Sequence, residues 1–240
     1  SLAASSFAED TATGTTIATA SVTNTTGDAI TFSLSGTGSE NFSVSSGGTV
    51  TLNSALDFES TTSYNLTLTA SDGTNTATNN LVFSVSNINE AVTLSTSVAS
   101  SSFSEDVSTG TTIATASATD PENATISYSL SGTGSDKFSV ASDGTVTLSS
   151  ALDYESTTSY SLTLTASDGT NSTSESIAFS VGDVNESLTL STTLAASSFA
   201  EDTATGTTIA TASATDPENA TISYTLSGTG SDKFVVSSSG

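Results

Sequence analysis

The sequence repeats itself every 96 residues. The tetrapeptide Phe-Ala/Ser-Glu-Asp begins at Phe7, Phe103 and Phe199, and longer phrases recur in the same register. A fixed period of this length indicates an array of one small module rather than a single large domain. We therefore expect repeat 1 at residues 1–91, repeat 2 at 92–187 and repeat 3 at 188–240, with repeat 3 covering only the first half of a module.

Each repeat alternates apolar and polar residues, which is typical of half-buried strands. In residues 159–166 (SYSLTLTA), Tyr160, Leu162 and Leu164 point to one side and the intervening Ser and Thr to the other. This sustained alternation argues against a disordered Ser/Thr-rich chain. About seven short strands per repeat, separated by turn signals such as Asp168-Gly169, predict an all-β chain. The expected architecture is a linear array of tandem Greek-key, seven-stranded, immunoglobulin-like β-sandwiches.

Composition excludes several classes of function. The formal net charge is -23, with 25 acidic residues against only Lys137 and Lys233, so nucleic acid and anionic membranes are poor partners. Cys and His are absent, which excludes disulfides, His–Cys zinc sites and Ser–His–Asp triads. No apolar run approaches the ~20 residues of a membrane span, so we expect no direct membrane insertion. The lack of a signal peptide and of any Met predicts an internal segment of a longer secreted protein.

The acidic residues concentrate at strand ends and turns. In repeat 2 they form the groups Glu105-Asp106, Asp120-Pro121-Glu122, Asp153-Tyr154-Glu155, Asp168 and Asp183-Val184-Asn185-Glu186. Carboxylates that converge at about 4 Å repel each other by roughly 1–4 kcal/mol per pair, so such a cluster needs a counter-ion. Oxygen ligands without His or Cys favour Ca²⁺, which takes 6–8 oxygens in flexible geometry.

These motifs, in this order and approximate spacing, resemble the calcium motifs of cadherin repeats. The chain looks most similar to the cadherin-like tandem repeats of large bacterial surface adhesins. In that family calcium lies at the junction between successive repeats. For the first junction the resemblance implies the ligands Glu9, Asp57, Glu59, Asn89, Glu90, Asp120, Glu122 and Asp168. For the second junction it implies Glu105, Asp153, Glu155, Asp183, Asn185, Glu186, Asp216 and Glu218.

The sequence departs from the family pattern in its linkers. Asn87 stands where repeat 2 has Asp183, and Glu90 and Glu186 stand where the family has its second Asp. We therefore expect fewer or weaker ions at the first junction. In repeat 1 Asn24 stands where repeat 2 has Asp120, so any junction before Ser1 should be poor in calcium.

Other interpretations of these residues remain open. Asp72 and Asp168 each precede Gly and are good turn formers by themselves. Glu9 and Glu105 could simply be solvated surface acids. Asn-x-Ser/Thr sequons allow glycosylation as a minor alternative; they lie at Asn24, Asn41, Asn65, Asn123, Asn171, Asn185 and Asn219.

The function expected from the resemblance is mechanical. The acid pair Asp153/Glu155 has the form of a glycosidase pair, but it recurs in repeat 1 as Asp57/Glu59 and no aromatic sugar platform accompanies it, so we expect no enzyme. We expect a secreted or cell-surface module, rigidified by calcium, that serves as the extender stalk of an adhesin whose adhesive ligand is bound outside this segment. Its partners would be neighbouring repeats of the same chain.

Two other roles remain open. One is a subunit of a self-assembling extracellular filament or sheath, in which other copies of the chain complete repeat 3. Direct homophilic adhesion is the least expected role. In animal cadherins that mode resembles strand exchange anchored by a buried Trp, and this chain has none.

Overall fold

The computed structural model describes residues 1–23 and 27–240 of the chain. Asn24, which we compared with Asp120, lies outside the described residues. The elements are β1 (Ser6–Ala8), β2 (Thr16–Thr19), β3 (Thr31–Ser35), η1 (Ser39–Asn41), β4 (Phe42–Val44), β5 (Thr49–Leu52), β6 (Ser63–Ser71), β7 (Thr76–Ser86), β8 (Thr93–Val98), β9 (Ser102–Ser104), β10 (Thr112–Thr119), β11 (Ser127–Ser131), η2 (Ser135–Lys137), β12 (Phe138–Val140), β13 (Thr145–Leu148), β14 (Ser159–Ser167), β15 (Ser172–Gly182), β16 (Thr189–Leu194), β17 (Ala210–Thr215) and η3 (Ser231–Lys233).

The chain divides into two compact units. The first consists of Ser1–Thr93, Thr119–Ser127 and Ser167–Thr173, and the second consists of Leu94–Ala118, Tyr128–Ala166 and Ser174–Gly240. The first unit therefore holds repeat 1 together with two short segments of repeat 2. In the described part of the chain no helix is long and apolar enough to cross a membrane.

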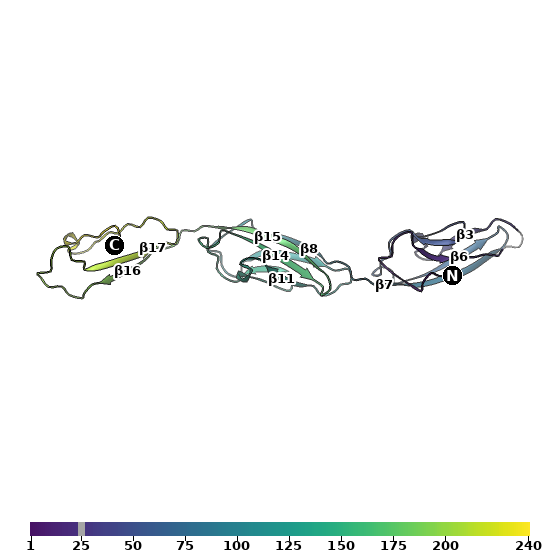
Figure 1. Ribbon diagram of the computed structural model, residues 1–240, viewed down its shortest axis with the longest axis horizontal. Coiled ribbons are helices and arrows are strands. Elements are labelled where there is room, and N and C mark those ends of the chain that lie inside the picture. Colours follow the sequence, from purple (N-terminus) through teal and green to yellow (C-terminus); the bar gives the residue numbers. More distant parts are fainter. Residues whose placement is uncertain (24–26) are drawn as a thin grey trace. The chain divides into compact units, whose positions relative to one another are not determined.

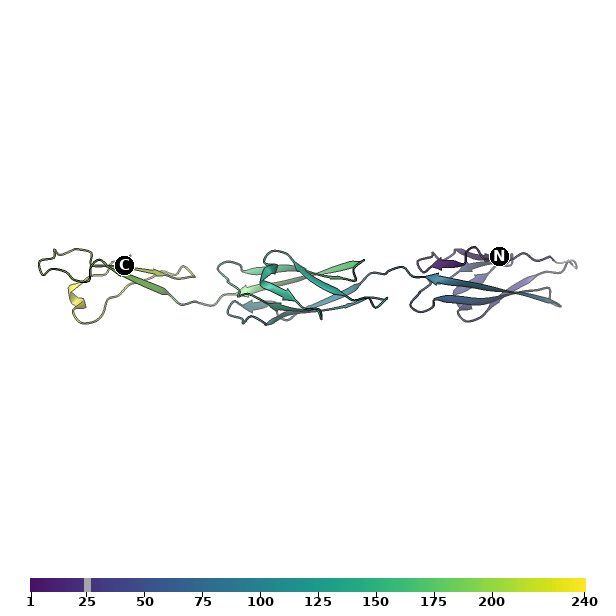
Figure 2. The same cartoon turned by 90° about the horizontal axis from the view of Figure 1, so that it is seen from below.

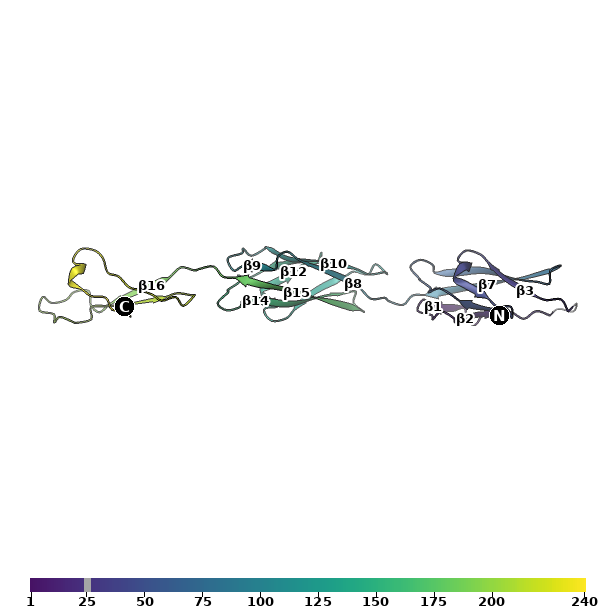
Figure 3. The ribbon, with the colours of Figure 1, turned by 90° about the horizontal axis from the view of Figure 1, so that it is seen from above.

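Repeat 2 is a sandwich of two four-stranded sheets, in the orders β12-β13-β10-β8 and β11-β14-β15-β9. β14 lies between β11 and β15 (Figure 1), and β10 and β12 lie in the opposite layer (Figure 3). The connections from β11 to β12 and from β13 to β14 cross between the sheets, which gives the Greek-key connectivity of immunoglobulin-like sandwiches. The predicted all-β sandwich is confirmed.

The first of the seven expected strands is split in two. β8 lies at the edge of one sheet, whereas β9 pairs in parallel with β15 in the other, with Phe103 opposite Val181. One segment of chain thus contributes to both layers, which raises the number of strand segments in repeat 2 to eight.

The core of repeat 2 follows the predicted alternation. Tyr160, Leu162 and Leu164 of β14 are at most 4% exposed. The Tyr160 ring stacks on Phe179 with centroids 5.4 Å apart and meets Phe138 edge-on at 5.2 Å. Because strand side chains alternate between faces, the intervening Ser and Thr are left at or near the surface. This pairing of aromatic rings is repeated in repeat 1 by Phe42, Tyr64 and Phe83.

Repeat 1 has sheets in the orders β1-β7-β6-β3 and β2-β5-β4. β1 runs parallel to β7, with Phe7 opposite Val85, so the C-terminal ends of both strands lie at the same end of the sheet. Leu2, which corresponds to Val98 at the end of β8, forms an isolated bridge with Ala18.

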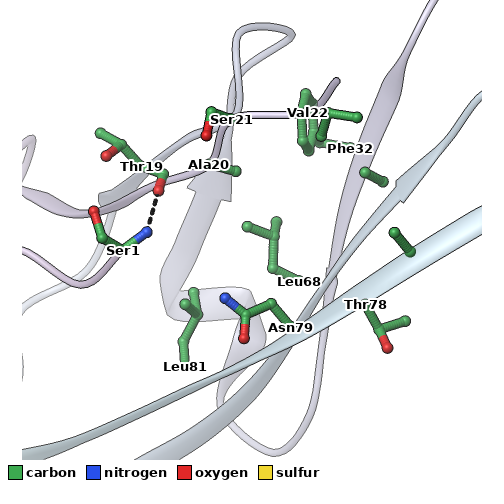
Figure 4. A pocket seen from close by; sticks show the side chains of 12 residues that line it. Ser1, Thr19, Ala20, Ser21, Val22, Phe32, Leu68, Thr78, Asn79 and Leu81 are labelled. Carbon is green, nitrogen blue, oxygen red and sulfur yellow. Dashed lines mark hydrogen bonds between the residues drawn. The ribbon is translucent and has the colours of Figure 1, made fainter. Parts of the chain in front are cut away.

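A pocket of about 280 Å³ opens beside that bridge (Figure 4). Its lining consists of Ser1, Thr19, Ala20, Ser21, Val22, Phe32, Leu68, Ala70, Ala77, Thr78, Asn79 and Leu81. In repeat 2 the corresponding position is covered by β8. There Ser95 hydrogen-bonds to Ser117 O, and Thr96 to Glu175, the counterparts of Ser21 and Asn79.

Repeat 3 contains the antiparallel pair β16 and β17, the yellow-green strands of Figure 2. Leu190 lies opposite Ala214 and Leu194 opposite Ala210. These leucines are 64% and 67% exposed, because the described part of repeat 3 provides no second sheet to cover them.

Candidate metal centres

Glu9 directly follows β1 and lies at the end of the sheet where β1 and β7 terminate. Its N–H donates to Ser86 O at 3.1 Å, which extends the parallel pairing by one residue. Its carboxylate then accepts two backbone N–H groups from distant parts of repeat 1, Phe58 at 2.7 Å and Ile88 at 2.5 Å. The side chain is 5% exposed. Glu9 is therefore a buried carboxylate that joins three loops, rather than a solvated surface acid.

Glu105 repeats this arrangement in repeat 2. Its N–H donates to Gly182 O at 3.0 Å, and its carboxylate accepts the N–H groups of Tyr154 at 2.6 Å and Val184 at 2.7 Å. Glu105 is 6% exposed. The alternative that Glu9 and Glu105 are merely solvated is thus wrong, since both lie inside a ring of backbone donors.

A group of four glutamates lies within the first compact unit. Glu9, Glu59, Glu90 and Glu122 each offer a carboxylate oxygen, and these oxygens all lie within 4.8 Å of one another. Glu9 follows β1, and Glu59 lies in the loop between β5 and β6. Glu90 lies in the linker and Glu122 in the turn after β10, so four separate segments contribute one acid each.

The other predicted ligands of the first junction lie around this group. Asp57 accepts the Ser60 N–H at 2.7 Å and so caps its own turn. Asp120 is 8% exposed and accepts the Ala124 N–H at 2.9 Å, while its second oxygen is buried without a hydrogen-bond partner. Asn89 donates to Asp168 at 2.8 Å. None of Asp57, Asp120 and Asp168 belongs to the group of four.

The second compact unit holds two overlapping acid groups. One consists of Glu105, Asp153 and Glu155, and the other of Glu155, Asp183 and Glu218. The Glu186 N–H donates to Glu218 at 2.5 Å. The remaining predicted ligands of this junction, Asn185, Glu186 and Asp216, do not belong to either group. Asn185 donates to Glu186 O at 2.9 Å, and Asp216 accepts the Ala220 N–H at 3.2 Å.

A turn-forming role accounts fully for the contacts of Asp72 but only in part for those of Asp168. Asp72 accepts the N–H groups of Thr74 and Asn75, which lowers its pKa and accounts for it as a turn residue. Asp168 makes the same turn contacts and in addition accepts the amide of Asn89, which is the largest cause of its lowered pKa.

Carboxyl groups at both sites meet in pairs. The neighbouring carboxyl of Glu122, followed by desolvation, raises the pKa of Glu90 to about 7, and the nearness of Glu90 lowers the pKa of Glu122. In the second unit Glu218 likewise raises the pKa of Glu186 to about 7, while the pKa of Glu218 falls to about 2. Two ionised carboxylates in contact repel each other, so one acid of each pair takes up a proton more readily than an isolated glutamate.

The residues fit a hard divalent cation. Among the described residues, buried carboxylate oxygens without a hydrogen-bond partner occur at Glu90, Asp120, Glu122, Glu186 and Glu218. The only basic side chains in the sequence are Lys137 and Lys233, and Lys137 donates to Ala151 O. Unpaired buried oxygens are costly. An oxygen-only, anionic donor set is the kind that Ca²⁺ prefers.

Sequence reasoning missed two kinds of contact. Backbone N–H groups of Phe58, Ile88, Tyr154 and Val184 hold Glu9 and Glu105, and backbone donors leave no residue signature. The other is Asn171, whose side chain donates to Asn89 O at 3.0 Å and to Glu90 O at 2.8 Å. Asn171 was noted only as a sequon, and its position three residues after Asp168 was the available signal.

The cadherin domain model matches residues 4–86 and 99–181, which together make up more than half of the chain. The chain belongs to the cadherin domain family. Cadherin domains in general bind Ca²⁺, are typical of extracellular proteins, and are structural adhesion modules rather than enzymes. This chain is accordingly an adhesion-type module of tandem cadherin repeats. No curated protein sequence matches it.

Solved cadherin structures share the fold. Protocadherin gammaB7 EC3-6, described as a cis-dimer, matches with a TM-score of 0.56 and 27% identity over 88% of this chain and 53% of its own. The protocadherin GammaB4 extracellular domain matches with a TM-score of 0.56 and 28% identity over 88% of this chain and 36% of its own. Human protocadherin-24 EC1-2 matches with a TM-score of 0.52 and 22% identity over 74% of this chain and 94% of its own, which shows the fold alone. The chain thus spans about half the length of the first and about a third of the second.

Proposed function

We propose that the chain is a calcium-rigidified spacer, the extender stalk of a cell-surface adhesin of the large bacterial type. The observation that carries this proposal is the group formed by Glu9, Glu59, Glu90 and Glu122, in which four chain segments bring carboxylate oxygens within 4.8 Å of one another. Such a group is stable in one arrangement only when its charge is neutralised.

The mechanism is the locking of a linker. Bound calcium supplies positive charge and up to eight coordination positions for oxygens. Glu9 is already held by Phe58 and Ile88, so it acts as the fixed part of the site. Glu90 lies on the linker and Glu122 on the turn after β10, and a bound cation would relieve the repulsion between their carboxylates. Neutralising them fixes the linker relative to the turn that carries Glu122.

We also propose the organisation of the parent protein. The module boundaries are placed at residues 91/92 and 187/188, in segments without strands. The ligands of the two sites are the residues that the cadherin resemblance implies, with Glu186 and Glu218 taking in the second site the roles of Glu90 and Glu122. The chain works outside the cell without enzymatic activity, next to neighbouring repeats, while the adhesive ligand binds elsewhere in the protein.

Small-angle scattering of the 240-residue chain, with calcium and with chelator, tests this proposal. Extracellular modules bind calcium at about 10⁻⁴–10⁻³ M, so the two conditions should be millimolar calcium and EGTA. We expect the distribution of dimensions to broaden and the maximum dimension to change on chelation. Glu122→Gln should weaken calcium binding in calorimetry, whereas Asp136→Asn, at an exposed position, should not. An unchanged maximum dimension would rule the proposal out.

A second candidate is a subunit of an extracellular filament. In that role other copies of the chain would cover the face of β16 on which Leu190 and Leu194 are 64% and 67% exposed. A β16 strand donated by a second copy would form a head-to-tail contact, which propagates into a filament.

Light scattering over a range of concentrations distinguishes these roles. A filament subunit should assemble as concentration rises, and Leu190→Ser should abolish assembly. A chain that stays monomeric excludes the filament. A dimer insensitive to Leu190→Ser would instead favour direct homophilic adhesion.

A further inference from the structure

Asn171 connects the linker to the turn between β14 and β15. Its side-chain amide donates to two successive linker carbonyls, Asn89 O at 3.0 Å and Glu90 O at 2.8 Å. The linker also donates a hydrogen bond to the turn, from the Asn89 side-chain amide to the Asp168 carboxylate at 2.8 Å. All four residues belong to the first compact unit.

The turn that presents Asn171 is rigid for local reasons. Asp168 accepts the N–H groups of Thr170 and Asn171, both at 2.6 Å, and Ser167 donates to Asn171 O at 2.9 Å. These bonds involve the backbone of Asn171 and leave its side chain free to reach the linker. The amide is therefore positioned before any ion arrives.

The contacts of Asn171 do not depend on a cation. Two carbonyl oxygens and one amide group carry no net charge, so the interaction persists when the acids around it are protonated or ionised. It also places Glu90, whose own N–H donates to Glu122 at 3.2 Å. The amide thus opposes the repulsion between carboxylates that would otherwise drive the linker away in the absence of calcium.

We propose that Asn171 is a positioning residue that latches the carbonyls of Asn89 and Glu90, and so keeps the Glu90 carboxylate at the acid group without an ion. The first linker then stays partly ordered at low calcium and is preorganised for binding. The inference extends the proposed function, but its test is made in chelator and does not require that calcium bind.

Repeat 1 offers a matched control. Asn75 occupies the same place in the turn between β6 and β7 and makes the same backbone contact with Asp72, at 2.6 Å. Among the described residues, however, its side chain donates to Asp72 alone, at 3.4 Å. Asn75→Ala therefore removes the same chemical group from the same kind of turn without touching the linker.

The experiment is amide hydrogen exchange by NMR on the whole chain in EGTA, comparing wild type with Asn171→Ala, Asn171→Asp and Asn75→Ala. Losing a neutral hydrogen-bonded latch should speed exchange of the Glu90 N–H by roughly 2- to 10-fold in both Asn171 variants. Asn75→Ala should leave it unchanged, and amides of β14 and β15 should show that the turn is intact in every variant.

Three results would overturn the latch: unchanged Glu90 exchange in Asn171→Ala, equal acceleration in Asn75→Ala, or loss of protection throughout β14 and β15. A calcium titration by calorimetry then separates the two proposals. If the exchange effect is found but calcium does not bind, the latch stands and the calcium-rigidified function fails.

Discussion

Glu105→Gln should separate the structural role of the buried glutamate from its role in repulsion. The Glu105 carboxylate accepts two backbone N–H groups, and hydrogen bonds to a charged group contribute about 1.5–3 kcal/mol each. A glutamine keeps one acceptor oxygen and turns an NH₂ group toward the second N–H. The expected cost is therefore one charged hydrogen bond, or about 1.5–3 kcal/mol. Against this, the substitution removes one charge from the group with Asp153 and Glu155.

Glu155→Gln serves as the control for the charge. Glu155 is exposed and belongs to the same group. Partial desolvation of its carboxyl by the neighbouring chain, followed by the charges of Glu105, Asp183 and Glu218, raises its pKa. Its replacement relieves repulsion without removing the two backbone bonds, so in chelator it should stabilise repeat 2. Glu105→Gln should be less stable than Glu155→Gln by about 1.5–3 kcal/mol. Both variants should bind calcium more weakly.

Hydrogen exchange at increasing urea, read by mass spectrometry on peptides from residues 159–182, measures this difference for repeat 2 alone. The local readout is needed because a chain of several modules does not unfold in one two-state step. Equal stabilities of Glu105→Gln and Glu155→Gln would refute the reasoning, since the backbone bonds would then contribute nothing.

Two further predictions concern protons and packing. The pKa of Glu90 and of Glu186 in the folded chain is about 7, above the ordinary 4.5, so the stability of the calcium-free chain should decrease as pH rises from about 4.5 to about 7. For the same reason calcium binding near pH 6 should release protons. Calorimetry in buffers of different ionisation enthalpy measures the number of protons released, and zero release would contradict the raised pKa values. Gly134 has φ 76°, and a Cβ added there would lie 2.6 Å from the Tyr160 ring. Gly110 has a similar φ of 87° but faces open space, so Gly134→Ala should lower the melting temperature of repeat 2 more than Gly110→Ala does. Equal losses would show that the contact with the ring is unimportant.

The fold was predictable because its signal is local. Alternation at every second residue placed Leu162 and Leu164 in the core, and both are fully buried. The split of the first strand into β8 and β9 was not predictable, because it depends on which sheet edge each half meets. The acids could be chosen from composition and order, but their individual roles could not.

The sequence by itself determined the period, the strand faces and an excess of carboxylates with almost no basic partners. Tertiary structure decided which carboxylates meet. Glu9 joins Phe58 and Ile88, which are 49 and 79 residues away, and Glu122 reaches Glu90 across 32 residues. These residues meet because loops from non-adjacent strands come together at the end of the sheet where β1 and β7 terminate in parallel. No local spacing in the sequence encodes that arrangement. For the same reason Asn171, a turn residue in sequence, contacts the linker only in the folded unit.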